Sequence, residues 1–432
     1  LLARHANHKD KRWVSIPKYS LWVVSVGYIG FYLMAQPSIT QVLTWFHSIL
    51  FKWEWELFLS DPFIFLFWVF IIVTTFFWGR GMFCGWLCPY GAMSELAFKI
   101  AGKLGLKRYQ RKLPAHVHDK LKWTKYAVFA GLLGVSFYSM GMAEKLAEVE
   151  PFKTTFLVGV WNRPWPFVLF WVALLAAALF IERPFCKYLC PLGAGLAVPS
   201  TFRWWGLKRK AECGPCAACA VGCGSQAIDK SGRIDQRECL LCLDCMVMYY
   251  DDHACPPLSK ERKQRIKAGL PLTPIGANGY YIPITPVPLA APTVEPPLGV
   301  LAWLRSEAID HLLPWSGKFL ARPLLFRATG IAFAVFITWI WLLGAAGRLG
   351  HGIILAWWLA WSAYELVVRM NCKAYVKEGP WWGRRFRPAS WADMAAYVGM
   401  KNLLIGAALF LFMKAAGALD VLRGLPALQW PF

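Results

Sequence analysis

The stretch AECGPCAACAVGCGSQAIDKSGRIDQRECLLCLDCMVMYYDDHACPPL, residues 211–258, holds eight of the thirteen cysteines of this chain. Three cysteines follow one another as C-x2-C-x2-C, and a fourth comes after three further residues. A second triplet repeats the pattern before a closing Cys255-Pro256 pair. Such runs are typical of bacterial proteins with two iron–sulfur clusters, in which the fourth cysteine of each run ligates the other cluster. The spacing therefore predicts a bacterial-ferredoxin-like α+β domain with two 4Fe–4S clusters.

This rule divides the eight cysteines into two ligand sets. Cluster I takes Cys213, Cys216, Cys219 and Cys255, and cluster II takes Cys239, Cys242, Cys245 and Cys223. A thiolate at every third residue of a tight loop reaches three corners of a cube, and small residues between them let backbone N–H groups approach the sulfides. Two features depart from the usual pattern. Gly224 stands where proline is common, and a DDHA insert precedes Cys255.

Zinc sites and structural disulfides stay open as alternatives to iron–sulfur ligation. Four-cysteine zinc sites usually show two separated C-x2-C pairs rather than triplets. Structural disulfides are rare on the cytoplasmic side of a membrane, where the charge pattern places this segment. The spacing therefore favours iron–sulfur ligation over both.

The composition is that of an integral membrane protein. Hydrophobic residues make up 57% of the 432 residues, with 25 Trp and 29 Phe, and several apolar runs are long enough to cross a bilayer. The formal charge of +22 comes from Lys and Arg that lie mostly between these runs. No recognition module accompanies the charge, so we expect no nucleic acid partner.

Seven apolar runs have the length of membrane spans. They lie at about residues 19–36, 62–79, 125–142, 166–182, 325–346, 351–368 and 396–416. Lys and Arg gather at the amino-terminal end, in the 99–125 loop, in the cluster domain and in the 369–387 loop. By the positive-inside rule these parts face the cytoplasm. The sequence therefore predicts a multi-pass protein of a bacterial inner membrane with a cytoplasmic iron–sulfur domain.

The predicted fold class is a polytopic α-helical membrane protein with this domain inserted. We divide it into a duplicated transmembrane hairpin domain of four spans (1–200), the two-cluster domain (201–258), a proline-rich cytoplasmic linker (259–322) and a membrane extension of about three spans (323–432). Trp303 to Trp315 is a candidate interfacial helix within the linker.

An internal repeat carries four further cysteines. GMFCGWLCPYGA at 81–92 and RPFCKYLCPLGA at 183–194 share the pattern x-x-F-C-x-x-L-C-P-x-G-A, with the cysteines 102 residues apart. Each copy follows an apolar hairpin of similar length, so the hairpins are expected to be two facing copies of one unit.

The repeated C-x3-C-P motifs contain Cys84 and Cys88 in the first copy and Cys186 and Cys190 in the second. On a helix, cysteines at i and i+4 share one face, and the following prolines bend or stop the chain. Four converging thiols suit copper, zinc, an iron–sulfur centre or a dithiol redox pair. The alternative is that they are small buried hydrophobes. Two matching copies favour a redox or metal role.

Other side chains give weaker evidence for a functional role. His47 is a candidate quinol contact but is more simply an interfacial histidine. His116 and His118 are expected to be solvated loop residues, and Cys372 to be structural.

Taken together, these motifs resemble the NosR/NirI family of membrane iron–sulfur flavoproteins over about residues 19–258. The likeness rests on WGRGMFCGWLCPYGAMSEL, AEVEPFKT, ERPFCKYLCPLGA and CLLCLDCMVMYYDDHACPPL. Members of the family usually carry a periplasmic domain with covalent FMN before the membrane part. The chain starts at Leu1 without a preceding signal peptide, so we expect upstream sequence and place FMN only there. The three apolar runs after the linker do not match the short tail expected of the family.

The resemblance implies electron transfer from the quinol pool or a cytoplasmic donor toward periplasmic nitrous-oxide reductase, in support of its activity or maturation during denitrification. The candidate partners are membrane lipid, quinol, that reductase or its maturation proteins, and a second copy of the chain in a homodimer. A copper-site assembly factor, with copper at the C-x3-C-P cysteines, and a redox-sensing regulator are the alternatives.

Overall fold

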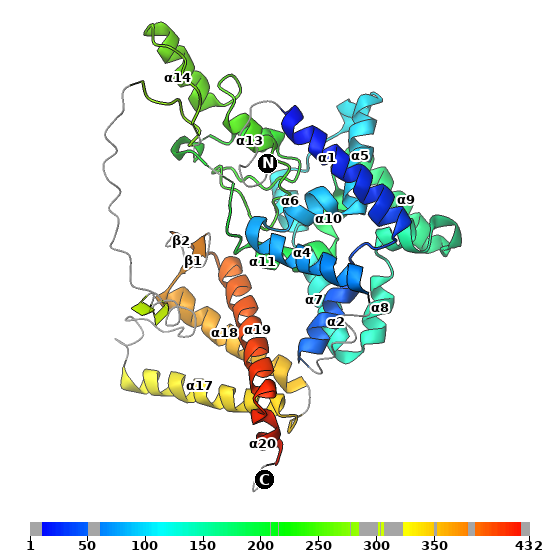
Figure 1. Ribbon diagram of the computed structural model, residues 1–432, viewed down its shortest axis with the longest axis vertical. Helices are drawn as coiled ribbons and strands as arrows, with labels where there is room; N and C mark the ends of the chain where they lie inside the picture. Colours follow the sequence, from blue (N-terminus) through cyan, green and yellow to red (C-terminus); the bar gives the residue numbers. More distant parts are fainter. Residues whose placement is uncertain are drawn as a thin grey trace. The chain divides into compact units, whose positions relative to one another are not determined.

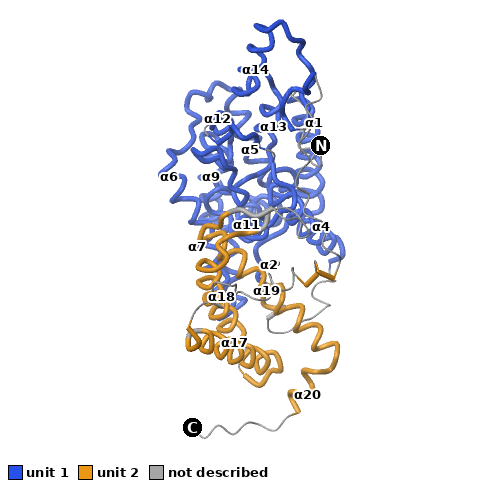
Figure 2. The backbone as a smooth tube through the Cα atoms, turned by 90° about the vertical axis from the view of Figure 1, so that its left-hand side faces the viewer, with its two compact units in different colours: residues 1–43, 58–292 blue, residues 44–57, 293–432 orange. Residues whose placement is uncertain are grey.

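The computed structural model describes residues 11–50, 61–284, 323–349, 352–378 and 385–424, without the single residues 208, 215 and 277, and the short pieces 301–302 and 304–305. The chain divides into two compact units (Figure 2), Leu1–Leu43 with Phe58–Pro292 and Thr44–Leu57 with Thr293–Phe432. The described part is mostly helical (Figure 1).

The first repeat begins with one continuous helical stretch, α1 (Arg12–Val24) followed by the π-helix η1 (Ser25–Tyr32). After α2 (Ile39–Leu50), the apolar helix α4 (Pro62–Trp78) runs to the first motif. Asp61 caps α4 by accepting a hydrogen bond from the Ile64 N–H at 3.1 Å, and Gly79, with φ +87°, ends it. The strong apolar pattern of this stretch and its cap explain why the predicted span became a helix.

The first motif breaks the helix rather than continuing it. The π-helix η2 (Phe83–Leu87) stops at Cys88, which is extended (φ −71°, ψ 115°) and caps α5 (Pro89–Lys103). The expectation that Cys84 and Cys88 share one helix face is therefore wrong, because a residue before proline is driven out of the helical region. The loop after α5 contains η3 (Leu106–Tyr109) and α6 (Ala115–Leu121).

The second repeat likewise leads through an apolar helix to its motif and ends in a helix that starts after the second motif cysteine. Its elements are α7 (Thr124–Tyr138), α8 (Met140–Ala147), η4 (Lys153–Leu157), η5 (Val160–Asn162), α9 (Trp165–Phe180), α10 (Pro184–Tyr188) and α11 (Pro191–Ser200).

The repeats pack reciprocally. Helix α5 packs on η1 of its own repeat and on α9 of the other, while α11 packs on α7 of its own repeat and on α4 of the other. Tyr90, Phe152, Phe156, Leu174 and Phe185 form the apolar core between them. The two motifs are thereby brought to one place.

The cluster domain consists of loops and short helices. These are η6 (Ala211–Cys213), α12 (Ala218–Gly222), α13 (Asp244–Tyr249) and α14 (Pro256–Lys267). The described residues from 201 to 284 hold only two isolated antiparallel bridges, in place of the expected strands. Ile228 pairs with Ile234 in the cluster domain, and Ile275 pairs with Tyr281 in the predicted linker. The first part of the predicted linker is helical, because two prolines fit the first turn of α14 and good helix formers follow.

The second unit contains α17 (Leu324–Ala345), α18 (Gly352–Cys372), α19 (Trp391–Ala415) and α20 (Ala418–Gly424). Strands β1 (Tyr375–Glu378) and β2 (Arg385–Pro388) pair antiparallel between α18 and α19, with Tyr375 opposite Pro388. The predicted interfacial helix at Trp303–Trp315 lies almost wholly outside the described residues.

Three helices of the described chain are long and apolar enough to cross a membrane: Arg327–Ala345 within α17, α18 and α19. They coincide with the three predicted spans of the membrane extension. Helices α4 and α9 are apolar but have 17 and 16 residues, which is shorter than a usual span of about 20. The four spans of the first unit therefore stay a prediction.

Candidate functional site

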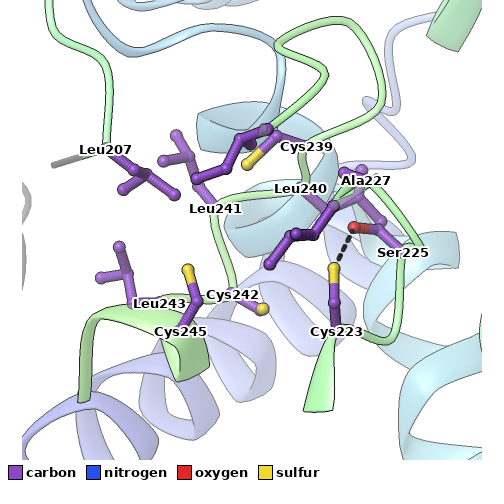
Figure 3. A pocket seen from close by; sticks show the side chains of 12 residues that line it. Leu207, Cys223, Ser225, Ala227, Cys239, Leu240, Leu241, Cys242, Leu243 and Cys245 are labelled. Atoms are coloured by element: carbon purple, nitrogen blue, oxygen red, sulfur yellow. Dashed lines mark hydrogen bonds between the residues drawn. The ribbon is translucent and has the colours of Figure 1, made fainter. Parts of the chain in front are cut away.

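Four cysteines of the cluster domain line one pocket, and they are the four predicted for cluster II. Figure 3 shows the side chains of Cys223, Cys239, Cys242 and Cys245 around this space, with leucines closing it. Leu241 and Leu243 have φ of +50° and +65°, a conformation that is unusual for leucine. These two left-handed residues alternate with the cysteines and turn the loop so that the thiols share the pocket.

Burial is the main influence on two of these thiols. It raises the pKa of Cys242 and Cys245 well above that of an ordinary thiol, because a buried anion is poorly solvated. A thiolate at these positions requires a cation beside it, and the irons of a cluster supply that charge. The pocket and its ligands therefore fit a 4Fe–4S cluster, while ligation itself stays a prediction.

The cysteines predicted for cluster I also gather. Cys219 is close enough to the other three members of its set to interact electrostatically with each of them. Lys210 joins both ends of the set, because its backbone N–H donates to Cys213 Sγ at 3.4 Å and its ammonium to Cys255 Sγ at 3.3 Å. The long insert before Cys255 therefore does not carry this cysteine away from its set.

The two sets touch each other. Cys219 Sγ lies 3.3 Å from the Met248 sulfur and 4.0 Å from the carbonyl oxygen of Cys245. Three members of set I are partly exposed, and helix α12 beside them has no buried residue. Set I is therefore the more exposed set, since only two members of set II are partly exposed.

The first motif lies directly against the loop of set II. A Cβ on Gly81 would lie 2.6 Å from the carbonyl carbon of Leu240, and one on Gly85 would overlap the Leu240 oxygen. The Trp86 indole N–H donates to the Leu241 carbonyl at 3.0 Å. Only glycine permits this approach of the two backbones.

The second motif holds the other end of set II. The Lys187 ammonium donates to the Gly224 carbonyl at 3.1 Å, next to Cys223. A Cβ on Gly224 would overlap the Glu182 carboxylate.

A buried carboxylate fastens the cluster domain to both repeats. Glu238, beside Cys239, accepts from Arg80 at 3.1 Å, from Lys125 and from Tyr126 at 2.9 Å. Burial alone would raise the pKa of Glu238, but the two cations and the hydrogen bonds lower it to about 2. The carboxylate is therefore charged at neutral pH, and the chain uses it as an ionic link.

The arginines beside the motifs reach across the repeats. Arg80 donates to the Gly193 carbonyl at 3.1 Å. Arg183 donates to the carbonyls of Cys84 and of Gly85, the latter at 3.1 Å. It also pairs with buried Glu95 at 2.7 Å. Each repeat thus holds the backbone of the other at the motif.

The four motif cysteines lie together in this frame. Cys186 is close enough to each of the other three to interact electrostatically. Cys88 and Cys190 cap α5 and α11 by accepting from the Gly91 and Gly193 N–H groups at 3.4 and 3.2 Å.

The arrangement of the described cysteines limits what they hold. All thirteen are free thiols, so none forms a disulfide. Among the described His, Cys, Asp and Glu side chains, no three stand close enough to ligate one metal ion. The geometry gives no support to a mononuclear zinc or copper site, whereas a cube separates its ligands farther than a single ion does.

The structure also corrects the expectation for His118. His118 is buried, and its Nδ1 lies 3.0 Å from the Tyr188 hydroxyl on α10. Burial lowers the pKa of His118. The polar neighbours along α6 suggested a solvated residue, because they do not reveal which helix face meets α10.

The comparisons with known proteins fall on the same segments. The NosR family model matches residues 211–266, which contain the eight-cysteine run. The 4Fe-4S binding domain model matches twice, at 60–107 and 163–205, and each match contains one C-x3-C-P motif. No solved structure matches.

Three relatives show the extent of the similarity. Regulatory protein NosR of Pseudomonas aeruginosa is 48% identical over 243 residues, 56% of this chain and 34% of that protein. Protein NirI of Paracoccus denitrificans is 46% identical over 245 residues, 56% of this chain and 35% of that protein. A second sequence named regulatory protein NosR, also from Pseudomonas aeruginosa, is 55% identical over 84 residues, 19% of this chain and 84% of that sequence. The chain thus spans about a third of the length of the two longer relatives.

Proposed function

The chain belongs to the NosR/NirI family of membrane iron–sulfur proteins, and on that premise we propose that it is a membrane electron-transfer protein. It passes electrons from the quinol pool or a cytoplasmic donor toward periplasmic nitrous-oxide reductase, and so supports the activity or maturation of that enzyme in denitrification. The observation that carries the proposal is that the segments holding the set II cysteines contact both C-x3-C-P motifs directly.

Each set of residues has one task in this function. Sets I and II hold the two 4Fe–4S clusters, which when bound supply one-electron redox chemistry. The glycines of the first motif remove side chains from between the set II loop and Cys84. Glu238 and Lys187 fix the loop at its two ends, one beside Cys239 and the other beside Cys223.

The order of the groups supports transfer between solvent and the membrane part. Set I is the more exposed set, set II contacts set I and the motifs, and Cys84 and Cys186 of the motifs are buried. The Lys112 ammonium from the basic 99–125 loop donates to the carbonyl of Ala220 at 3.1 Å. The cluster domain thus sits on the basic side of the first unit, which supports a cytoplasmic location at an inner membrane.

The assignment of the clusters is tested by two serine variants and one control. We expect anaerobically purified Cys223→Ser to lose the EPR signal of one cluster and Cys255→Ser that of the other. Cys372→Ser, outside both sets, keeps both signals. Full zinc occupancy without iron or acid-labile sulfide contradicts the proposal. The proposal is also contradicted if both cysteine variants keep both EPR signals.

Experiments in membranes distinguish electron transfer from redox sensing and from copper-site assembly. Reduction of the clusters by added quinol supports electron transfer. A redox-sensing regulator, the second candidate, is suggested by the name regulatory protein given to the relatives. Such a protein shows cluster reduction without continued quinol turnover when an acceptor is present. Stoichiometric copper at the motif cysteines favours an assembly factor instead.

A further inference from the structure

A buried ammonium group lies against the cysteines of set I. Lys210, which directly precedes η6, is only 4% exposed. Its Nζ donates to the Tyr249 carbonyl at 2.8 Å and to Cys255 Sγ at 3.3 Å. Its backbone N–H donates to Cys213 Sγ at 3.4 Å. One lysine therefore contacts the first and the last cysteine of the set.

Aromatic rings enclose this ammonium. The Lys210 Nζ lies 4.6 Å from the ring centroid of Tyr249 and 5.6 Å from that of Tyr280. The Tyr249 hydroxyl donates to the Asn278 carbonyl at 2.6 Å. Gly279, with φ +82°, lies so close to the Tyr249 ring that a Cβ there would overlap it. Because ring faces attract a cation, the enclosure holds the ammonium at the set.

The buried charge of Lys210 has no carboxylate partner among the residues that the structure describes. Glu212 interacts with it electrostatically, but Glu212 is exposed and accepts a hydrogen bond from the Tyr280 hydroxyl at 2.6 Å instead. A buried cation without a counter-charge is unfavourable. A thiolate at Cys255, with the iron–sulfur cluster that it ligates, supplies this counter-charge.

Set II has no comparable charged donor. Cys223 Sγ lies 3.4 Å from the Ser225 hydroxyl, which is a neutral group. No described Lys or Arg side chain donates a hydrogen bond to a sulfur of set II. Asp244, within the second triplet, adds negative charge, and its partner at 2.8 Å is the exposed Lys11. The electrostatic environments of the two sets therefore differ.

Lys210 stands where its charge acts on the reduction of a cluster in set I. Net charge, hydrogen bonds to the sulfurs and solvent exposure determine the reduction potential of an iron–sulfur cluster. A cluster with four thiolate ligands is negative, and an added electron makes it more negative. A charge-assisted hydrogen bond to a ligand sulfur therefore stabilises the reduced form more than the oxidised form. Charges this close interact strongly enough in a protein interior to change an equilibrium by about tenfold or more.

We propose that Lys210 sets the reduction potential of the set I cluster and keeps it above that of the set II cluster. The step is a one-electron reduction, in which a one-electron donor is oxidised and no covalent bond forms or breaks. Lys210 carries no electron and acts through Cys255, so it is a positioning residue. The inference rests on the proposed function, because it requires a 4Fe–4S cluster in each set.

The test is an EPR-monitored redox titration of the full chain in lipid nanodiscs, with mediators as the electron source. The signal that Cys255→Ser loses identifies the set I cluster, and the signal that Cys223→Ser loses identifies the set II cluster. In the wild type we expect the set I cluster to have the higher potential. Lys210→Met lowers this potential by about 59 mV or more, which is a tenfold change in a one-electron equilibrium, and leaves the set II potential unchanged.

Two variants of the same position and one control separate the charge of Lys210 from a structural role. Lys210→Arg keeps the positive charge and is expected to stay close to the wild-type potential. Lys210→Gln keeps an N–H donor without the charge and is expected to lower the potential. Lys263→Met removes an exposed lysine of α14 and is expected to change neither potential.

Two results overturn the inference and leave the assignment of the clusters intact. One is a set I potential at or below the set II potential in the wild type, and the other is an unchanged set I potential in Lys210→Met. If Lys210→Met and Lys210→Gln both fail to assemble the set I cluster, a structural role replaces the proposed one. If the wild type shows no iron–sulfur signal at all, the proposed function fails and the inference fails with it.

Discussion

Replacement of Glu238 by glutamine tests how the cluster domain is held on the repeats. Arg80 and Lys125, which are 1% and 0% exposed, both donate to Oε2 of this carboxylate. In Glu238→Gln the two cations stay buried beside each other without a counter-charge. Removal of one partner of a buried ion pair costs about 3–5 kcal/mol. We therefore expect the population in which the cluster domain has left the repeats to rise by about two to four orders of magnitude.

Alkylation of Cys84 measures this opening. The thiol is buried and the set II loop lies against its neighbour Gly85, so we expect a maleimide to reach it faster when this loop leaves the first motif. When closing is faster than alkylation, the rate follows the open population. The rate in Glu238→Gln is expected to exceed the wild-type rate by the same two to four orders of magnitude, estimated from the buried-pair cost.

Two further variants provide alkylation rates with which the rate in Glu238→Gln is compared. Arg80→Met leaves Glu238 with Lys125 and Tyr126, so the expected increase is smaller. Asp229→Asn in the same domain removes an exposed pair and should cost no more than about 1 kcal/mol. If alkylation in Glu238→Gln is no faster than in Asp229→Asn, Glu238 does not hold the cluster domain on the repeats.

Burial leads to expectations for two other sites. Gly85→Ala forces a methyl group onto the Leu240 carbonyl and should destabilise the docked loop by about 1–3 kcal/mol or more. Gly134→Ala, at a position on α7 with open space around it, should stabilise the protein by up to about 1 kcal/mol. Equal stability of the two variants in urea unfolding would contradict this expectation. The pKa of His118 is lowered by burial, so the stability that its neutral ring contributes against Tyr188 is present above its ordinary pKa of about 6.5 and is lost as the pH falls through the lowered value. Thermal unfolding between neutral and acidic pH should show this loss in the wild type and less of it in His118→Gln.

The sequence predicted those features that depend on local pattern. The three long helices of the second unit lie within a few residues of the predicted runs, because about twenty apolar residues in a row leave little choice. The cysteine spacing likewise predicted a set of four that shares one pocket. Periodicity did not predict the break at Cys88, although the proline after it is the local signal that accounts for the break.

The charged residues of the site could not be predicted in the same way. Lys125 counted toward the positive 99–125 loop, a role that requires solvent exposure, yet it is buried, as is Arg80. Arg80 meets a carboxylate 158 residues away, and no spacing along the chain encodes such a distance. The one available signal is that Glu238 directly precedes a predicted ligand, where an unpaired carboxylate beside cluster thiolates is unfavourable.

Duplication of the hairpin has not produced two equivalent halves. Both arginines bind the backbone of the opposite motif, but their carboxylate partners differ. Arg80 pairs with Glu238 of the cluster domain, whereas Arg183 pairs with Glu95 of the first repeat. The first pair fastens the iron–sulfur domain, and the second joins the two repeats. The repeated frame therefore brings the cysteines together, while the two arginines differ in the carboxylate that each of them binds.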